Sequence, residues 1–161
     1  MNQFNVILGT PASGKTTIAI ADIVSQLKQG KTCLLLSYEY DDVYIYEQME
    51  KIMSSYDISN IKKGHQLKIM TLKDGTYKEL RDAVKSAEKT FDLFWVGRMD
   101  NIYLDNANFL ERNSKDIPLS KIHSEIISTL SPNKNPRVVL LSQMNRDALN
   151  STPISQQLSF Y

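Results

Sequence analysis

The sequence predicts an α/β fold in which helices cover both faces of a mainly parallel, five-stranded sheet. Short apolar runs without polar alternation are typical of strands buried on both faces, as in parallel sheets. These runs alternate with stretches whose apolar residues recur at helical spacing, which favours right-handed β–α–β units stacked in three layers. The runs predicted as strands span residues 4–8, 32–37, 67–72, 93–96 and 138–141.

The helices are predicted from apolar residues that share one face. The stretch over residues 16–29 is the clearest, because its apolar residues recur at i, i+3, i+4 and i+7 and Gly30 follows as a terminator. Thr76 and Glu79 have the spacing of a capping box at the start of another helix. Further helices are predicted over residues 41–53 and 119–130. Two segments lack periodicity: residues 101–116, predicted as a loop, and the tail from about 150, which can dock or stay flexible.

Composition limits the class of protein. The chain has 161 residues, which predicts one domain over residues 1–161. Its net charge of +1 gives no overall basic field, so nucleic acid could bind only through a local patch. One cysteine, Cys33, excludes an internal disulfide and, with two histidines, offers no zinc site. No apolar run reaches the ~18 residues of a membrane span, and no signal-peptide pattern precedes the first strand, so we expect a cytoplasmic protein without a membrane partner.

The strongest motif lies between the first predicted strand and the first helix. Residues 9–16 read Gly-Thr-Pro-Ala-Ser-Gly-Lys-Thr and match the phosphate-loop pattern GxxxxGK(S/T) in full. Gly9 and Gly14 allow the close approach of backbone to phosphate. The amides of the turn and the helix N-terminus favour negative charge. We expect every residue of this turn to contact the nucleotide: Gly9, Thr10, Pro11, Ala12, Ser13, Gly14, Lys15 and Thr16.

The end of the motif supplies the chemistry. Lys15 is a point charge for the β- and γ-phosphates, and is therefore a predicted catalytic residue. The hydroxyl of Thr16 is a predicted Mg²⁺ ligand, and Thr17 can contact the α-phosphate or cap the helix. The chain has no N/T-K-x-D element for reading guanine, so ATP is the favoured nucleotide.

Polar residues also follow two other predicted strands. Glu39, in the segment SYEY, can orient and deprotonate a water molecule that attacks the γ-phosphate. Its alternative role is that of an acidic residue at a helix N-terminus. Gln143, in the segment SQMNR, can donate a hydrogen bond to the γ-phosphate, the alternative being an ordinary transition from strand to loop.

The phosphate loop, SYEY and SQMNR together resemble the motor domain of replicative hexameric DNA helicases of the DnaB type, which has a RecA-like fold. The resemblance covers residues 4 to about 146. It implies that Glu39 is the catalytic glutamate, that Gln143 senses the γ-phosphate and that Arg146 is a further polar contact. It also implies ATP hydrolysis, single-stranded DNA as a partner, and assembly into a homo-oligomer or with a helicase-type partner.

Two features depart from the family pattern. The strand predicted over residues 93–96 is followed by Gly97, where the family has the Walker B aspartate that holds the Mg²⁺-bound water. Asp100 can replace it as a metal residue if the chain turns back, and is otherwise a loop residue. The family's amino-terminal domain, linker helix and arginine finger have no counterpart. We therefore expect a minimal, truncated or divergent relative with weakened hydrolysis.

Three functions remain open from the sequence. The first is an ATP-dependent, helicase-like motor on single-stranded DNA, and the second is an ATP-binding regulator or helicase-associated factor that hydrolyses poorly. A small-molecule kinase ranks last, because the arginines are scattered rather than gathered in a lid. The basic residues Arg98, Arg112, Lys115 and Lys121 can contact the phosphates of DNA or lie in a solvated loop. The tyrosines Tyr38, Tyr40, Tyr44 and Tyr46 can stack on a base or line a subunit contact, but partial burial against the sheet is the favoured interpretation.

Overall fold

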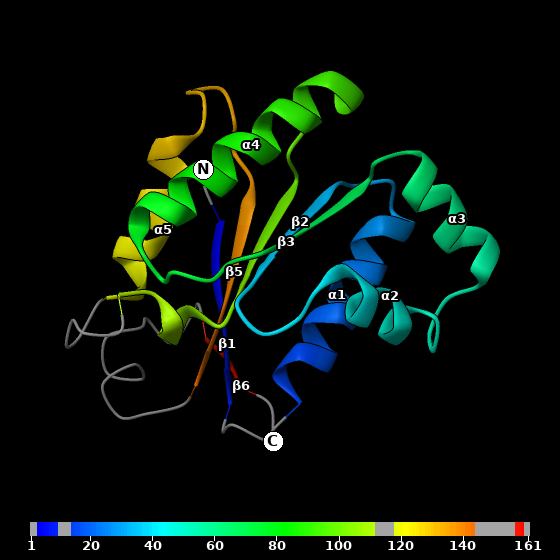
Figure 1. The fold of residues 1–161 in the computed structure, drawn as a ribbon, viewed down its shortest axis with the longest axis horizontal. Helices are drawn as coiled ribbons and strands as arrows, with labels where there is room; N and C mark the ends of the chain where they lie inside the picture. Colours follow the sequence, from blue (N-terminus) through cyan, green and yellow to red (C-terminus); the bar gives the residue numbers. More distant parts are fainter. Residues whose placement is uncertain (1–2, 10–13, 112–117, 144–156, 160–161) are drawn as a thin grey trace.

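The computed structural model describes residues 3–9, 14–111, 118–143 and 157–159, and every structural statement below is confined to them (Figure 1). Its strands form one sheet in the order β3–β2–β4–β5–β1–β6, and each neighbouring pair is parallel. The strands are β1 (Gln3–Gly9), β2 (Cys33–Ser37), β3 (Leu67–Thr71), β4 (Asn101–Asp105), β5 (Arg137–Gln143) and β6 (Gln157–Ser159).

Helices cover both faces of the sheet, which gives the three layers that the sequence predicts (Figure 1). One face packs against α1 (Lys15–Lys28), α2 (Asp42–Met49) and α3 (Ser55–Lys63). The other face packs against α4 (Tyr77–Trp95), the short 3-10 helix η1 (Ala107–Phe109) and α5 (Leu119–Thr129). The α3 helix was not among the predicted elements.

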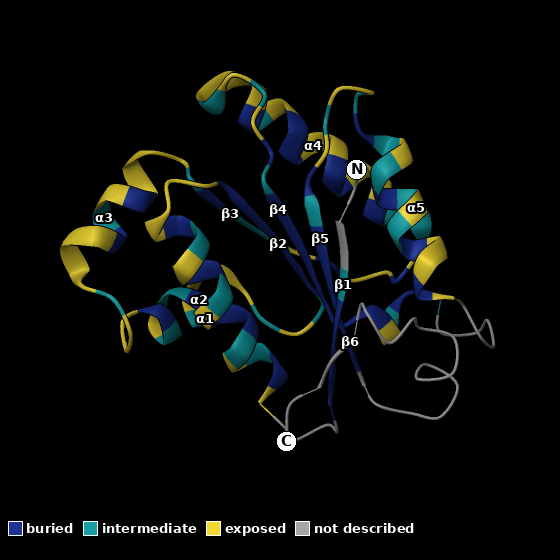
Figure 2. Cartoon of the chain, turned by 180° about the vertical axis from the view of Figure 1, so that it is seen from behind, coloured by how far each residue is buried: buried dark blue, intermediate teal, exposed yellow. Residues whose placement is uncertain are grey.

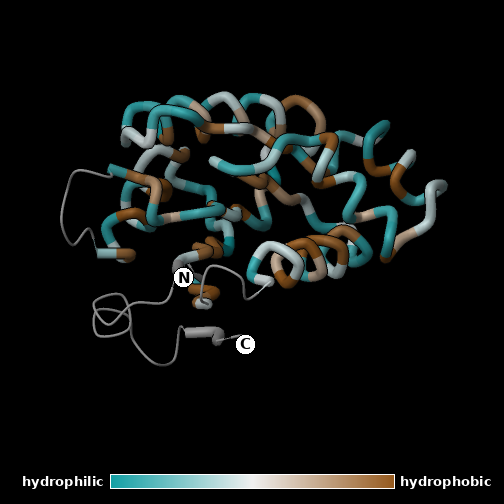
Figure 3. The backbone as a smooth tube through the Cα atoms, turned by 60° about the horizontal axis from the view of Figure 1, so that its bottom comes forward, coloured by the Kyte–Doolittle hydropathy of each residue, from teal (hydrophilic) through white to brown (hydrophobic). Residues whose placement is uncertain are grey.

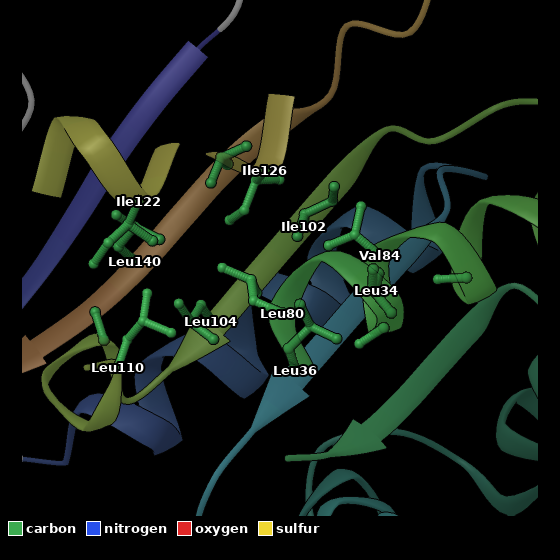
Figure 4. Close-up of a cluster of buried hydrophobic side chains, with 14 of the residues drawn as sticks. Leu34, Leu36, Leu80, Val84, Ile102, Leu104, Leu110, Ile122, Ile126 and Leu140 are labelled. Carbon is green, nitrogen blue, oxygen red and sulfur yellow. The ribbon is translucent and has the colours of Figure 1, made fainter. Parts of the chain in front are cut away.

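The strands divide their side chains between two hydrophobic cores. In β4, Ile102 and Leu104 belong to the core under α4 and α5, whereas Tyr103 belongs to the core under α1. This alternation is the period of two that any strand imposes, and here both faces are buried. Figure 2 shows the central strands β2 and β4 as buried and the outer faces of the helices as exposed. In Figure 4, apolar side chains of β2, β4 and β5 meet those of α4 and α5.

Side chains at the helix N-termini explain where several helices begin. The side chains of Asp41, Ser54 and Thr76 each accept a hydrogen bond from a backbone N–H in the first turn of α2, α3 and α4. The predicted cap at Thr76 is therefore confirmed.

Along the helices, hydrophobic and hydrophilic segments alternate, as Figure 3 shows from the end at which the strands terminate.

One predicted strand is wrong. Residues 93–95 form the last turn of α4, and the strand lies further along, at Asn101–Asp105, inside the segment predicted as a loop. The apolar run looked like a buried strand, yet Leu93 is 76% exposed and Val96 is 96% exposed. The prediction of a parallel sheet stands, but the sheet has a sixth strand, β6, in the tail.

A buried ion pair joins α4 to the loop before β5. The Glu88 carboxylate lies 3.1 Å from the Lys134 ammonium, and both side chains are at most 8% exposed. Glu88 also accepts hydrogen bonds from the Ser131 N–H at 2.9 Å and from Lys85 at 3.2 Å. Burial alone raises a carboxyl pKa, but these hydrogen bonds outweigh burial and lower the pKa of Glu88 to about 2.

Replacing Glu88 by glutamine is expected to lower the free energy of unfolding by about 2 kcal/mol at pH 7, because the buried Lys134 loses a charged partner. A carboxyl whose pKa is depressed on folding stabilises the protein above its unfolded pKa, and this contribution is lost as the pH falls through the folded pKa. The deficit of the variant should therefore shrink from pH 4.5 toward pH 2.

Urea denaturation at pH 7 and pH 3.5 measures this deficit. Asp82→Asn is the control, since Asp82 pairs with Lys78 on the exposed face of the same helix and such pairs contribute little. A deficit of equal size at both pH values would contradict the assignment.

Candidate functional site

Several of the predicted site residues lie at the carboxyl ends of the strands. Because the strands are parallel, these ends share one edge of the sheet, which is where ligands of open α/β sheets bind. Gly9, at the end of β1, lies opposite Gln143, at the end of β5. Ser37, at the end of β2, lies opposite Asp105, at the end of β4. The neighbouring turns are therefore brought together at this edge.

The start of α1 has the geometry of an anion site. Gly14 adopts a left-handed conformation with φ 80°, and the helix begins without a side-chain cap. A Cβ at Gly14 would meet nothing within 4 Å, so the backbone conformation, rather than crowding, calls for glycine. Lys15 is only 8% exposed, and Thr17 is exposed on the first turn. Thr10, Pro11, Ala12 and Ser13 lie outside the described residues.

A carboxylate that the sequence analysis missed lies beside the phosphate-loop helix. The Thr16 hydroxyl donates a hydrogen bond of 3.1 Å to Asp105, which is 3% exposed at the end of β4. Burial raises the pKa of Asp105 to about 6; the nearby Glu39 charge adds to this, while the Thr16 hydrogen bond and Lys15 oppose it. A buried carboxylate beside a hydroxyl is an oxygen donor set that suits Mg²⁺.

Asp100 does not take this position. It lies just before the amino end of β4, where its carboxylate accepts hydrogen bonds from the Thr32 N–H and from Arg98, each at 2.9 Å. At about 3.3 Å per residue, Asp100 and Asp105 are roughly 16 Å apart along the strand. The prediction that Asp100 holds a metal ion together with Thr16 is therefore wrong. The signal that could have found Asp105 was the apolar pair Ile102 and Leu104 before it.

Glu39 lies on the turn that follows β2. The Ser37 hydroxyl accepts hydrogen bonds from the backbone N–H groups of Glu39, at 3.2 Å, and Tyr40, at 3.0 Å. This turn leaves Glu39 exposed, near enough for its charge to raise the pKa of Asp105. Glu39 is therefore accessible to water at the same edge as Thr16.

The tyrosines around Glu39 pack against the protein. Tyr40 stacks on Tyr44 with ring centroids 4.1 Å apart, and Tyr38 stacks on Phe109 at 5.7 Å. Tyr46 lies under the Lys62 ammonium, which is 4.3 Å from the ring centroid. All four tyrosines are half-buried: Tyr38, Tyr40, Tyr44 and Tyr46. Burial, the favoured interpretation of this cluster, therefore matches the structure.

The remaining predicted residues either lie in other parts of the structure or fall outside the residues that it describes. Gln143 ends β5 beside the phosphate-loop strand, but its side chain and Arg146 lie outside the described residues, as do Arg112 and Lys115. Arg98 lies at the opposite edge, paired with Asp100. Lys121 has its ammonium 5.2 Å from the centre of the Tyr77 ring. Arg98 is thus separated from the carboxyl ends of the strands, where Thr16 and Asp105 lie.

Two broader properties bear on function. Within the described ranges, no cluster of three or more His, Cys, Asp or Glu side chains is arranged to hold a metal ion. Mg²⁺ needs no such cluster, because it is usually held by one or two protein oxygens together with substrate phosphates and water. Among the helices that the structure describes, none has the length and apolar character needed to cross a membrane.

Comparisons with known proteins agree with this architecture. No protein-family model and no curated protein sequence matches the chain. A solved structure of a DnaB-like replicative helicase, described with its interactions with primase, is 16% identical with a TM-score of 0.62, covering 96% of this chain and 42% of that one. A second solved structure, described as an ATPase domain, is 14% identical with a TM-score of 0.61, covering 96% of this chain and 63% of that one.

This chain therefore spans less than two thirds of the length of either similar structure. At such low identity, the likeness is one of fold. The similarity extends over nearly the whole chain and agrees with the parallel strand order and the phosphate-loop helix. The chain therefore shares the three-layer, RecA-like α/β fold of these two structures, as its sequence predicts.

Proposed function

We propose that this chain is a Mg²⁺-dependent ATPase motor core of the DnaB helicase type, driven by ATP and stimulated by single-stranded DNA. The observation that carries the proposal is the hydrogen bond of 3.1 Å between Thr16 and Asp105. It joins the hydroxyl of the phosphate-loop motif to a buried carboxylate at the end of β4, the pair of oxygen donors that phosphate-loop ATPases use for Mg²⁺. The two similar structures, a replicative helicase and an ATPase domain, support the same assignment.

Each residue has a distinct task in this proposal. Lys15 and the uncapped N–H groups at the start of α1 bind the β- and γ-phosphates. Thr16 and Asp105 hold Mg²⁺, whose positive charge, when it is bound, offsets the charge on the transferring phosphoryl group. Gln143, at the end of β5, donates a hydrogen bond to the γ-phosphate, and Arg146 is a further contact with it.

Glu39 acts as the general base. Its carboxylate accepts a proton from the attacking water as the water oxygen bonds to the γ-phosphorus. The bond between the γ-phosphorus and the bridging oxygen breaks, and the products are ADP and inorganic phosphate. The turn that Ser37 stabilises keeps this carboxylate at the nucleotide edge without burying it.

The other two functions are weaker candidates. The regulator was supported by Gly97 at the position of the Walker B aspartate and by the missing family segments, and the hydrogen bond between Thr16 and Asp105 weakens the first of these two arguments. A kinase needs arginines over the phosphates. The described arginines are engaged elsewhere, in pairs with acidic residues: Arg81 with Glu125, Arg98 with Asp100 and Arg137 with Asp22. The motor is also expected to assemble into a homo-oligomer or with a helicase-type partner.

An ATPase assay with and without single-stranded DNA tests the proposal. Wild-type protein should hydrolyse ATP in the presence of Mg²⁺, several-fold faster with DNA. Lys15→Ala should weaken nucleotide binding by about 100-fold and bring turnover to background, because the buried cation that faces the phosphates is lost. Lys28→Ala, at the exposed end of the same helix, is the control and should retain binding and turnover.

The outcome separates the candidates. If wild-type protein binds no ATP in calorimetry with Mg²⁺, the proposal fails altogether. ATP binding without turnover under any DNA condition would favour the regulator, and phosphate transfer to a nucleoside or nucleotide would favour the kinase.

A further inference from the structure

Helix α1 is joined to strand β4 by a series of polar contacts along its length. The two elements run in opposite directions, so that later residues of α1 meet earlier residues of β4. Every second residue of β4 takes part, because alternate side chains of a strand point to the same face. The three pairs are Thr16 with Asp105 at 3.1 Å, Asp22 with Tyr103 at 2.6 Å, and Gln26 with Asn101 at 3.1 Å.

The middle contact is the most extensively connected. The Asp22 carboxylate accepts a hydrogen bond of 2.6 Å from the hydroxyl of Tyr103, which is completely buried, and one of 2.7 Å from Arg137. Arg137 begins β5 and also donates to Asn101 at 3.3 Å. Asp22 therefore ties α1 to two neighbouring strands at once.

These contacts do what apolar packing cannot. The buried apolar residues of α1, such as Ile20 and Ile23, hold the helix against the sheet, but hydrophobic burial is not directional. A hydrogen bond has a preferred length and angle, so it resists sliding and rotation of the helix. Thr16 and Asp22 are six positions apart, about 9 Å along a rigid helix, so a shift at Asp22 is passed on to Thr16.

We propose that Asp22, Tyr103 and Arg137 form a positioning network that sets the spacing between Thr16 and Asp105, and through it the affinity of the nucleotide site for Mg²⁺. The proposal rests on the function proposed above. These three residues lie away from the proposed nucleotide site, since Asp22 comes later in α1 than Thr16 and Tyr103 comes earlier in β4 than Asp105. They act on the site only through the helix and the strands. Partners that orient metal ligands commonly change metal affinity by about 10- to 100-fold when they are removed.

Tyr103→Phe tests the network, because it removes one hydroxyl and keeps the buried ring. The expected result is that about tenfold more Mg²⁺ is needed to half-saturate the binding of a fluorescent ATP analogue. Binding of fluorescent ADP in the presence of EDTA should change by less than about twofold, because Lys15 and the α1 amides stay in place. Glu88→Gln is the matched control, since it destabilises the opposite face of the sheet.

A graded series at Asp22 separates positioning from a general loss of stability. Asp22→Asn keeps an acceptor for the Tyr103 hydroxyl but loses the charge that faces Arg137, whereas Asp22→Ala loses both. The Mg²⁺ requirement should increase from wild type to Asp22→Asn to Asp22→Ala. If Tyr103→Phe does not fold, the asparagine variant provides the measurement in its place.

Hydrogen exchange in the ligand-free protein gives a readout independent of the nucleotide. Amides of α1 from Ile18 onward should exchange about tenfold faster in Tyr103→Phe than in Glu88→Gln. Equal exchange rates in Tyr103→Phe and Glu88→Gln would overturn the network. So would a Mg²⁺ requirement of Tyr103→Phe equal to that of wild type, provided that wild-type protein binds nucleotide. Failure of wild-type protein to bind nucleotide overturns the proposed function instead, and the exchange comparison then still decides whether Asp22 and Tyr103 hold α1 in register.

Discussion

Replacing Asp105 by asparagine is expected to abolish Mg²⁺-dependent ATP hydrolysis and, at the same time, to stabilise the ligand-free protein. The carboxylate is 3% exposed, and burial disfavours its charge when no cation is bound. Asparagine has nearly the same shape and can still accept the hydrogen bond from Thr16, so the fold is kept. We expect at least about a 100-fold loss of hydrolysis and a gain of about 1 kcal/mol in the free energy of unfolding at neutral pH.

The opposite signs of these two effects distinguish a metal site from a structural residue. Steady-state ATPase measurements and urea denaturation in EDTA provide the two readouts. Asp100→Asn is the matched control at the other end of β4. It should lower stability, because its carboxylate holds Thr32 and Arg98, and it should leave hydrolysis nearly unchanged. An Asp105→Asn protein that is both less stable and still active would contradict the assignment.

Replacing Glu39 by glutamine is expected to separate binding from chemistry. Glutamine has the size of glutamate but cannot accept the proton of the attacking water, and removal of a general base typically costs about 100- to 10,000-fold in rate. The side chain is exposed, and the turn below it is stabilised by backbone hydrogen bonds to Ser37, so ATP affinity should stay within about threefold. Steady-state turnover and calorimetric titration with a non-hydrolysable analogue measure the two quantities.

Glu47→Gln is the control for this prediction, because Glu47 is also exposed, on the α2 helix that follows the Glu39 turn. It should hydrolyse ATP like wild type. If Glu39→Gln retained full turnover, the base would have to be sought elsewhere at this edge. If it lost ATP binding instead, Glu39 would be a residue of the binding site rather than the base.

The parts of the site that could be predicted are those whose chemistry is local. The phosphate loop depends on glycines, a lysine and a threonine that are close together in the chain, and Glu39 directly follows an apolar strand. Their positions at one edge follow from the parallel direction of the strands. For this reason the fold class, the layers and the edge that carries the predicted site could all be predicted from the sequence, before any tertiary contact was known.

Strand β4 could not be predicted in this way. Its residues Asn101 and Asp105 are polar yet buried, because partners distant in the chain satisfy them: Gln26 and the Thr32 carbonyl for Asn101, and Thr16 for Asp105. Sequence alone shows the polar groups without these partners, and such a segment looks like a loop. The end of α4 was wrongly predicted as a strand for the opposite reason. Leu93 and Val96 are apolar, as in a buried strand, but both side chains are exposed.

What the sequence by itself determined was therefore the phosphate-loop motif, the α/β order and the edge of the sheet on which the predicted site lies. Only the tertiary structure decided which aspartate lies beside Thr16 and how α1 is held against β4. The physical reason is that local patterns report the preferences of neighbouring residues, whereas the burial of a charge or a polar group depends on partners that folding alone brings within hydrogen-bonding distance.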